Sequence, residues 1–310
     1  MTSSTVILIA FLLLAGAVSM WVFFVIAATL LQTIRNGFKS ELSTSVSAVG
    51  VTFARYIWSI PIVALSILLI CLFVEEGPYL PNLEMIPYAI LTGFFQIIAT
   101  VAMVQLFQME NYAVGAGLAK SEAIAAAILG VLFFGSNLNA VGMAGVALGF
   151  IAVLIMSIQG VSSLPSVKTL ALGVFCGVGY AISSLLMREA ALRSGLMFPL
   201  DATWVLFIAL VFQFLGMAIY IRFKEPDTFR RLRARAKTTT YVSLTSTFGS
   251  LAWFSAMALM DVAITKTVGQ IEVLFTLIYA HYVLKQKPTQ RDIWGLILIG
   301  IAAVMVMLPA

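Results

Sequence analysis

Charged residues are scarce in this sequence and make up only 10% of its 310 residues. Soluble globular domains average about 25% charged and about 45–50% apolar residues, whereas 62% of this chain is hydrophobic. Its mean hydropathy is +1.07. A chain of this size has too few polar side chains to cover its surface in water, so lipid is its expected solvent. The composition therefore excludes a soluble globular protein and predicts an integral membrane protein.

Histidine and cysteine are also scarce. The chain has one histidine, His281, and two cysteines, Cys71 and Cys176, which lie in apolar runs. This set offers no disulfide framework and no spacing of metal ligands. The chain also lacks a phosphate-binding P-loop and the motifs of metalloproteases and serine hydrolases. We therefore expect no cofactor, no metal, no catalytic residue and no enzymatic activity.

The net charge of +5 does not point to nucleic acid as a partner. Seven of the 18 Lys and Arg residues lie between Arg222 and Lys237, and no aromatic platform for stacking bases accompanies them. We interpret this stretch as a solvated loop that faces lipid headgroups.

Ten apolar segments follow one another along the chain. Most are close to the ~20 residues that cross a ~30 Å hydrocarbon core, and short polar connections separate them. We therefore predict an all-α integral membrane protein with ten transmembrane helices, at residues 6–32, 46–74, 85–108, 112–134, 139–159, 169–192, 202–222, 239–260, 262–284 and 291–309.

The first segment is longer than one membrane crossing requires. Three readings stay open: an extended first helix, a signal peptide, against which the absence of a positive n-region argues, and a functional start at Met20. The predicted domains are an apolar extension continuous with the first helix (residues 1–19), a five-helix unit (20–159), a linker (160–168) and a second five-helix unit (169–310).

Lys and Arg residues predict the orientation of the chain. Thirteen of the 18 fall on one side of the predicted membrane, with Arg35 and Lys39 counted as loop residues after the first segment. The positive-inside rule makes this side cytoplasmic and places both termini outside. Lys39 and Arg188, near segment ends, are interpreted as interfacial anchors. The expected location is the plasma membrane, or the inner membrane in a cell with two.

The two halves of the chain resemble each other at an offset of 150 residues. Lys120-Ser121-Glu122 lies over Gln270-Ile271-Glu272, and Gly145 lies over Gly295. Few positions are identical, but two intramembrane glutamates coincide. Five helices per half is an odd number, so the two copies must enter the bilayer from opposite sides. This predicts an inverted repeat, a common plan of secondary transporters.

Several short sequences resemble the EamA type of the drug/metabolite transporter superfamily, and the resemblance extends over roughly residues 20–309. They are Leu31-Gln32-Thr33-Ile34-Arg35-Asn36, Arg55-Tyr56 with Pro61, Ala119-Lys120-Ser121-Glu122-Ala123, Trp253-Phe254 and Gly269-Gln270-Ile271-Glu272. The resemblance implies movement of small metabolites, often outward. It also implies a central cavity lined by the segments 6–32, 85–108, 112–134, 169–192, 239–260 and 262–284. Many members are described with cytoplasmic termini, unlike the orientation predicted here.

Glu122 and Glu272 are the chief candidate binding residues. A charge at mid-bilayer costs about 2.5–3.5 kcal/mol and normally faces a cavity or a partner. Each glutamate is expected about ten residues into its helix, or roughly 15 Å, which is near the midplane. They are predicted to bind a substrate amine or a coupling proton; packing against a neighbouring helix is the alternative.

The other candidate residues surround these glutamates in the sequence. Lys120 and Gln270 occupy equivalent repeat positions and are expected to line the site. Lys120 and Lys266 are expected to hold an anionic substrate group or to neutralise a carboxylate, and for Lys266 snorkelling to the interface is the alternative. Trp253 is a candidate for stacking on a solute, and Gln32 is either cavity lining or a contact between helices. Arg55 is assigned a structural pairing inside the membrane.

The predicted function is secondary active transport of a small organic solute by alternating access, with export as the expected direction and protons as candidate coupling ions. An uncoupled facilitator and a membrane scaffold without transport activity are the alternatives. The charge balance of two Glu and two Lys suits an amphoteric solute such as an amino acid. The expected partners are this solute, protons and the lipid bilayer; Gly-xxx-Gly pairs at Gly145–Gly149 and Gly173–Gly177 leave a homodimer open.

Overall fold

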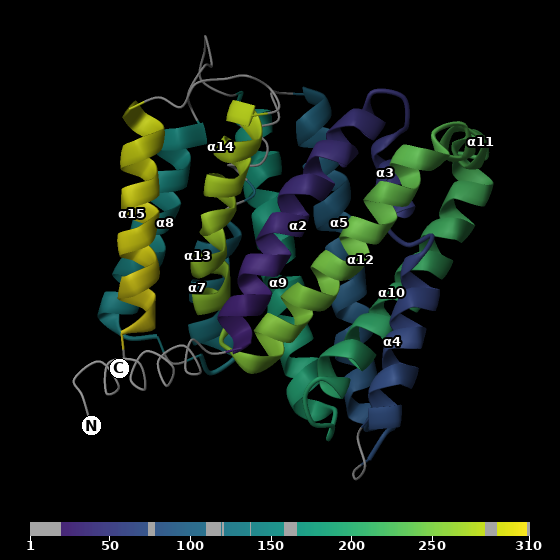
Figure 1. Ribbon diagram of the computed structural model, residues 1–310, viewed down its shortest axis with the longest axis horizontal. Helices are drawn as coiled ribbons and strands as arrows, with labels where there is room; N and C mark the ends of the chain where they lie inside the picture. The colour runs from purple at the N-terminus through teal and green to yellow at the C-terminus, as the bar shows by residue number, and fades with distance from the viewer. Residues whose placement is uncertain are drawn as a thin grey trace, which may run out of the picture.

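The computed structural model describes residues 20–73, 78–109, 119, 121–136, 138–157, 166–282 and 290–308. Every regular element in these ranges is a helix, and the helices stand side by side in one bundle (Figure 1). They are α2 (Met20–Ser43), α3 (Ala48–Ala54), α4 (Ser59–Phe73), η1 (Leu83–Met85), α5 (Ile86–Met109), α7 (Glu122–Phe133), α8 (Ala140–Ser157), α9 (Val167–Arg193), α10 (Leu200–Lys224), α11 (Asp227–Ala234), α12 (Ala236–Leu259), α13 (Val262–Val268), η2 (Gly269–Ile271), α14 (Glu272–Tyr282) and α15 (Gln290–Met307).

Six helical stretches are long and apolar enough to cross a membrane. They are Met20–Ser43, Ala48–Phe73, Leu83–Met109, Val167–Arg193, Leu200–Lys224 and Ala236–Leu259. Helices satisfy their backbone hydrogen bonds internally, as a lipid solvent requires. The other four predicted segments correspond to α7, α8, α13 to α14, and α15, which are shorter or broken within the described ranges. The chain is therefore an all-helical, multi-pass membrane protein.

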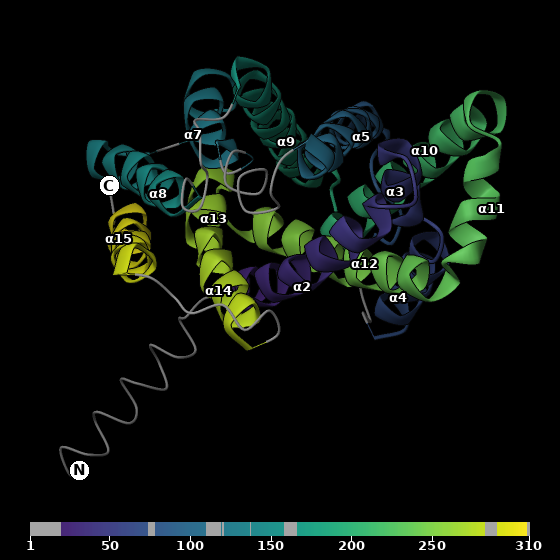
Figure 2. The ribbon, with the colours of Figure 1, turned by 90° about the horizontal axis from the view of Figure 1, so that it is seen from above.

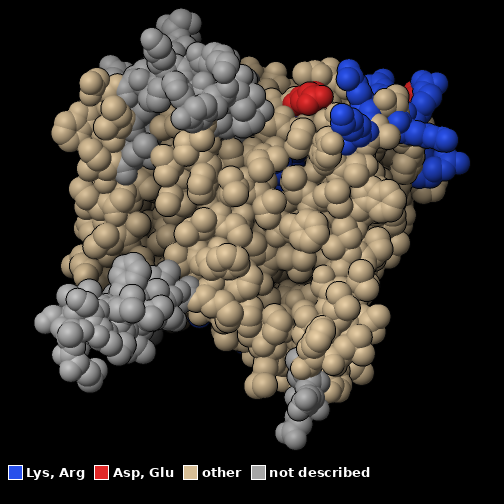
Figure 3. Space-filling model, viewed as in Figure 1, with Lys and Arg blue, Asp and Glu red and all other residues tan. Residues whose placement is uncertain are grey.

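The outer surface of the bundle is apolar over most of its height. Large side chains such as Phe73 and Phe133 are more than 70% exposed, a state that lipid stabilises and water does not. On the face shown in Figure 3, Lys and Arg gather at one corner, over α11 and its neighbours. All seven basic residues from Arg222 to Lys237 are exposed.

The first described helix extends further than the sequence predicted. Helix α2 continues to Ser43 instead of ending near residue 32, so Arg35 and Lys39 lie inside it. They are 6% and 0% exposed, because this face of α2 packs into the bundle. Counting these two residues as loop charges was therefore wrong, and so was the assignment of Lys39 as an interfacial anchor. The predicted extension, residues 1–19, lies outside the described residues.

The second predicted segment is two helices instead of one. A turn at Arg55–Trp58 separates α3 from α4. Pro61, in the first turn of α4, has no N–H with which to continue the helical bonding to residue 57. At the turn itself, Ser59 N bonds to the Tyr56 carbonyl at 3.3 Å, and the Arg55 carbonyl accepts hydrogen bonds from Ser59 Oγ at 2.5 Å and Ser243 Oγ at 3.2 Å. The break therefore places Arg55 at the end of a short helix.

The helices pair across the two halves of the chain. Helix α5 packs along α9, α2 along α12, and α8 along α15. Seen from above, the pair α5 and α9 lies opposite α2 and α12, and α7 and α13 lie at one end of the space between them (Figure 2). This arrangement encloses the cavity described below.

Glycines allow some of the closest helix contacts within the chain. A methyl group on Gly177 of α9 would overlap Ser121 Oγ and lie 2.9 Å from the backbone nitrogen of Glu122. A methyl on Gly145 would lie 2.8 Å from the Cβ atom of Met305 in α15. These glycines therefore join helices of one protomer, so their presence is no evidence for a homodimer.

We expect Gly177→Ala to lower the free energy of unfolding by about 1–3 kcal/mol, the usual cost of overpacking. Gly216→Ala is the matched control, because Gly216 also lies in a long helix but a methyl group added there would meet no heavy atom within 4 Å. There, alanine is expected to be neutral or stabilising by up to about 1 kcal/mol. Denaturant unfolding in detergent measures both, and equal effects would contradict the close contact at Gly177.

Candidate functional site

A polar cavity lies inside the bundle. Its volume is about 60 Å³, enough for several waters at roughly 10–15 Å³ each. The side chains that line it come from α2, the end of α3, α5, α7, α9, α12, α13 and α14, with Ala119 just before α7. They belong to Gln32, Arg35, Asn36, Arg55, Gln96, Met103, Ala119, Glu122, Tyr180, Ser183, Ser184, Met187, Ser250, Trp253, Phe254, Met257, Lys266 and Glu272.

Glu272 is held at one side of the cavity by α2. Gln32 Nε2 donates to Glu272 Oε2 at 2.8 Å, and Asn36 Nδ2 donates to Oε1 at 3.3 Å. Arg35 Nη2 in turn donates to Gln32 Oε1 at 2.9 Å. Glu272 is 4% exposed, so this carboxylate is stabilised by amide donors in place of water.

Glu122 is held at another side of the cavity. Lys266 Nζ of α13 lies 2.8 Å from Glu122 Oε1, and Ser184 Oγ of α9 donates to the same oxygen at 3.0 Å. The side chains of Lys266 and Glu122 are 12% and 17% exposed. Lys266 therefore faces inward as the partner of Glu122, which contradicts snorkelling to the interface.

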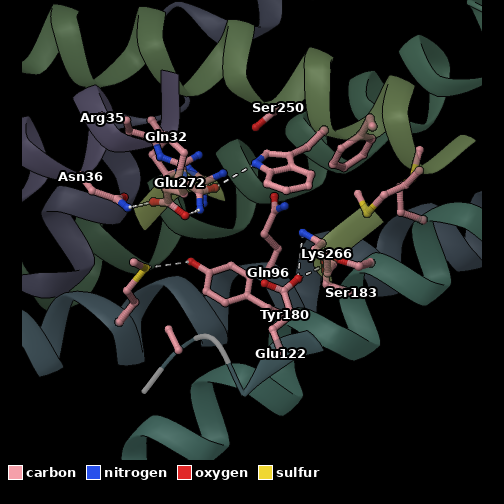
Figure 4. A pocket seen from close by; sticks show the side chains of 18 residues that line it. Gln32, Arg35, Asn36, Gln96, Glu122, Tyr180, Ser183, Ser250, Lys266 and Glu272 are labelled. Carbon is pink, nitrogen blue, oxygen red and sulfur yellow. Dashed lines mark hydrogen bonds and ion pairs between the residues drawn. The ribbon is translucent and has the colours of Figure 1, made fainter. Parts of the chain in front are cut away.

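Trp253 connects the two glutamate clusters. Its Nε1 donates to Gln32 Oε1 at 2.9 Å, and the Lys266 ammonium lies 4.1 Å from the centre of its ring. Figure 4 shows Glu272 beside Gln32, Arg35 and Asn36, and Glu122 beside Lys266, with Gln96 between the two groups. A continuous series of polar contacts thus runs from one carboxylate to the other.

Each glutamate is the first residue of a helix: Glu122 begins α7 and Glu272 begins α14. Ten helical residues, Val262–Ile271, precede Glu272, which agrees with its predicted depth of about ten residues; most of the residues before Glu122 lie outside the described ranges. Before Glu272, the helix changes to a 3₁₀ turn at Gly269–Ile271. The ring of Trp253 occupies the space that a side chain at Gly269 would fill.

Two further residues, Lys120 and Gln270, were also expected to line the site. Lys120 lies outside the described residues. Gln270 is fully buried and lines a smaller adjoining pocket of about 20 Å³ with Gln32, Glu122 and Lys266. Neither polar atom of its side chain has a hydrogen-bond partner in the described part of the chain, and the pocket is large enough for one water.

Arg55 lies in the cavity wall at 3% exposure. Its Nη1 donates to Thr100 Oγ1 at 2.7 Å, and Thr100 Oγ1 lies 2.9 Å from the Tyr180 hydroxyl. No ion pair of Arg55 occurs among the described residues. The Nη1 hydrogen bond of Arg55 is therefore to a hydroxyl group of the neighbouring helix α5.

Sequence reasoning missed Arg35, Asn36, Lys39 and Ser184. A usable signal was present in α2, where Gln32, Arg35, Asn36 and Lys39 follow the i, i+3, i+4, i+7 spacing of one helix face. It was lost because the segment was ended at residue 32. Ser184 gave no such signal, since a single serine in an apolar helix is common.

The cavity has no arrangement typical of a metal centre. Within the described ranges, no three His, Cys, Asp or Glu side chains lie close enough together to hold a metal ion. The polar groups instead comprise two carboxylates, amides, hydroxyls and three basic side chains, which suit reversible binding of a small polar solute or a proton.

Residues 167–308 match the EamA-like transporter family, and the chain matches no curated protein. It is similar to a protein of known crystal structure, with a TM-score of 0.70 over 93% of this chain and 96% of the other, at 12% sequence identity. At that identity, the similarity shows a shared fold alone. The family match shows that residues 167–308 belong to the EamA-like transporters, which are membrane transporters of small molecules, and the apolar helices agree with this match.

Proposed function

We propose that the protein is a secondary active transporter that exports a small organic solute by alternating access. The observation that carries the proposal is the presence of Glu122 and Glu272 in one polar cavity inside an apolar bundle. Ionisable groups inside a membrane protein commonly mark a substrate or ion path. In this proposal, Glu122 and Glu272 bind a substrate group or a proton, and Gln32, Trp253 and Lys266 position them.

We further propose ten helices in two inverted five-helix units, residues 20–159 and 169–310. The helix bounds that recur at an offset of 150 support this. Helices α7 and α14 begin at residues 122 and 272, α5 and α12 end at 109 and 259, and α8 and α15 span 140–157 and 290–307. The packing of α5 on α9 and of α2 on α12 corresponds under the same offset. Such repeats meet at a central binding site in many transporters.

In the proposed orientation, the basic corner formed around α11 faces the cytoplasm of a plasma-membrane protein. Helix α15 ends at the opposite face of the bundle from α11 (Figure 1). The exposed basic residues favour the leaflet with anionic headgroups. A reporter fused after Ala310 tests this orientation, because the proposal requires that end to lie outside.

In the proposed transport cycle, the glutamates change their binding partners. A proton on Glu122 weakens its attraction to Lys266, and a substrate amine competes with Lys266 for the same carboxylate. Either event frees Lys266 from α7 and loosens the contact between α13 and α7. Because Trp253 touches both Lys266 and Gln32, the change reaches the Glu272 cluster directly.

Transport in proteoliposomes tests the glutamate roles. A metabolite that raises the melting temperature of the purified protein is loaded as a radiolabelled substrate. Glu122→Gln and Glu272→Gln are each expected to lower its flux about tenfold or more, because a single charged interaction is worth at least about 1.4 kcal/mol here. Glu189→Gln is the control, since Glu189 pairs with Arg193 at the surface end of α9.

A pH gradient distinguishes coupled from uncoupled transport. Accumulation of the solute against its own gradient, driven by protons and lost in the glutamate variants, supports the proposal. Equilibration without accumulation would favour a facilitator. Unchanged flux and unchanged pH dependence in both variants would refute the role of the glutamates.

A further inference from the structure

The α2 and α3 side of the cavity is rich in buried basic groups. Arg35 and Arg55 line the cavity and are 6% and 3% exposed. Lys39 lies one helical turn beyond Arg35 on the same face of α2 and is fully buried. Buried charges normally have a partner of opposite charge, because the desolvation cost is otherwise high.

The carboxylates do not balance these basic groups. Among the described residues that line the cavity, the basic ones are Arg35, Arg55 and Lys266, and the acidic ones are Glu122 and Glu272. Lys266 is paired with Glu122, which leaves two guanidinium groups and one carboxylate on the other side. Arginine stays protonated in proteins, so this part of the cavity carries a positive excess.

Two of the basic groups retain unused hydrogen-bond donors. Arg55 Nε is buried and has no acceptor in the described ranges, although Nη1 donates to Thr100. The Lys39 amine likewise has no acceptor there. An unsatisfied buried donor costs about as much as a lost hydrogen bond. An anion entering the cavity would supply the acceptor and the opposite charge that these groups lack.

We propose that the transported solute is an organic anion, and that Arg35 and Arg55 bind its carboxylate or phosphate group. Guanidinium groups bind both through paired, charge-assisted hydrogen bonds. Lys39 stands behind them without lining the cavity itself, and an anion bound there would favour its protonated form, which then adds to the attraction. This assignment rests on the proposed transport function and specifies the class of its substrate.

Matched pairs of compounds test the assignment. The melting temperature of the purified full-length protein is measured with glutamate and glutamine, with glycerol 3-phosphate and glycerol, and with putrescine as a cation. We expect the anionic member of at least one pair to stabilise the protein and its neutral counterpart to have little effect. Arg55→Gln should weaken that binding by about tenfold or more, and Arg55→Lys by less.

Two more variants separate binding from folding. Arg188→Gln is the control, because Arg188 is bonded to the Met257 carbonyl and to Asp261 and does not line the cavity. It should leave the binding of the anion unchanged. Lys39→Met should raise the melting temperature of the ligand-free protein, since it removes an unsatisfied buried amine, and should reduce the stabilisation by the anion. A purely structural lysine would not produce both effects.

The outcomes distinguish this proposal from the transport proposal. Stabilisation by putrescine or neutral compounds alone would overturn the anion assignment, and solute flux that still depends on Glu272 would leave transport intact. Anion binding that is unchanged in Arg55→Gln and Lys39→Met would overturn the assignment of these residues. No stabilisation by any of these compounds would also overturn the anion class, whereas loss of all glutamate-dependent flux would refute transport itself.

Discussion

Lys266→Met is expected to lower the free energy of unfolding by about 3–5 kcal/mol, the usual cost of breaking a buried ion pair from one side. The variant leaves the Glu122 carboxylate with Ser184 as its remaining hydrogen-bond donor among the described contacts. It also removes the cation from the face of Trp253, an interaction worth about 0.5–2 kcal/mol. Denaturant titration in detergent, followed by near-UV circular dichroism, measures the change.

The double variant Lys266→Met with Glu122→Gln provides the decisive comparison. Replacing both charges removes the unpaired carboxylate, so most of the lost stability should return. Arg193→Met is the surface control, because Arg193 forms a solvent-exposed pair with Glu189, and it should change little. If Lys266→Met is as mild as this control, the Lys266–Glu122 pair does not hold α13 against α7.

Gln32→Leu is expected to lower transport about 100-fold at similar protein levels. Leucine has nearly the same size as glutamine but removes hydrogen bonds to Glu272, Arg35 and Trp253 at once. The loss of one bond to a charged group and of further bonds amounts to roughly 3 kcal/mol, or a factor of about 100. Initial rates in proteoliposomes, corrected for the amount of folded protein, measure the effect.

Gln105→Leu is the matched control for this experiment. Gln105 is also a glutamine in an apolar helix, but its side chain is exposed on α5 and does not line the cavity. It should retain normal transport. An equal decline in both variants would mean that removal of a polar group from a helix, and not the connection between the glutamates, causes the loss.

The membrane character and much of the site could be predicted from composition and repetition. Because charged residues are scarce, lipid is the expected solvent. An ionisable group inside the membrane is then expected to face a cavity or a partner. That logic selected Glu122, Glu272 and Lys266, all of which line the cavity. The offset of 150 residues also singled out the two glutamates together, and both line the same cavity.

Helix ends and contact partners could not be predicted in this way. Charge was taken as the sign of a loop, so a helix that buries Arg35 and Lys39 was ended too early. The break before Glu272 coincides with the place where the ring of Trp253 packs over Gly269, a contact between separate segments. Gln32 and Trp253 are 221 residues apart in sequence, and nothing in either local sequence indicates that they meet.

The 3₁₀ turn between α13 and α14 separates two charged residues of the site, which lie on different helices. Bending a continuous helix strains or breaks several backbone hydrogen bonds, whereas a pivot at a short 3₁₀ turn disturbs only a few weak ones. Lys266 lies on α13 and Glu272 begins α14, so the pivot falls between them. A bend at this turn would therefore move the Lys266 ammonium and the Glu272 carboxylate relative to each other without bending α13 or α14.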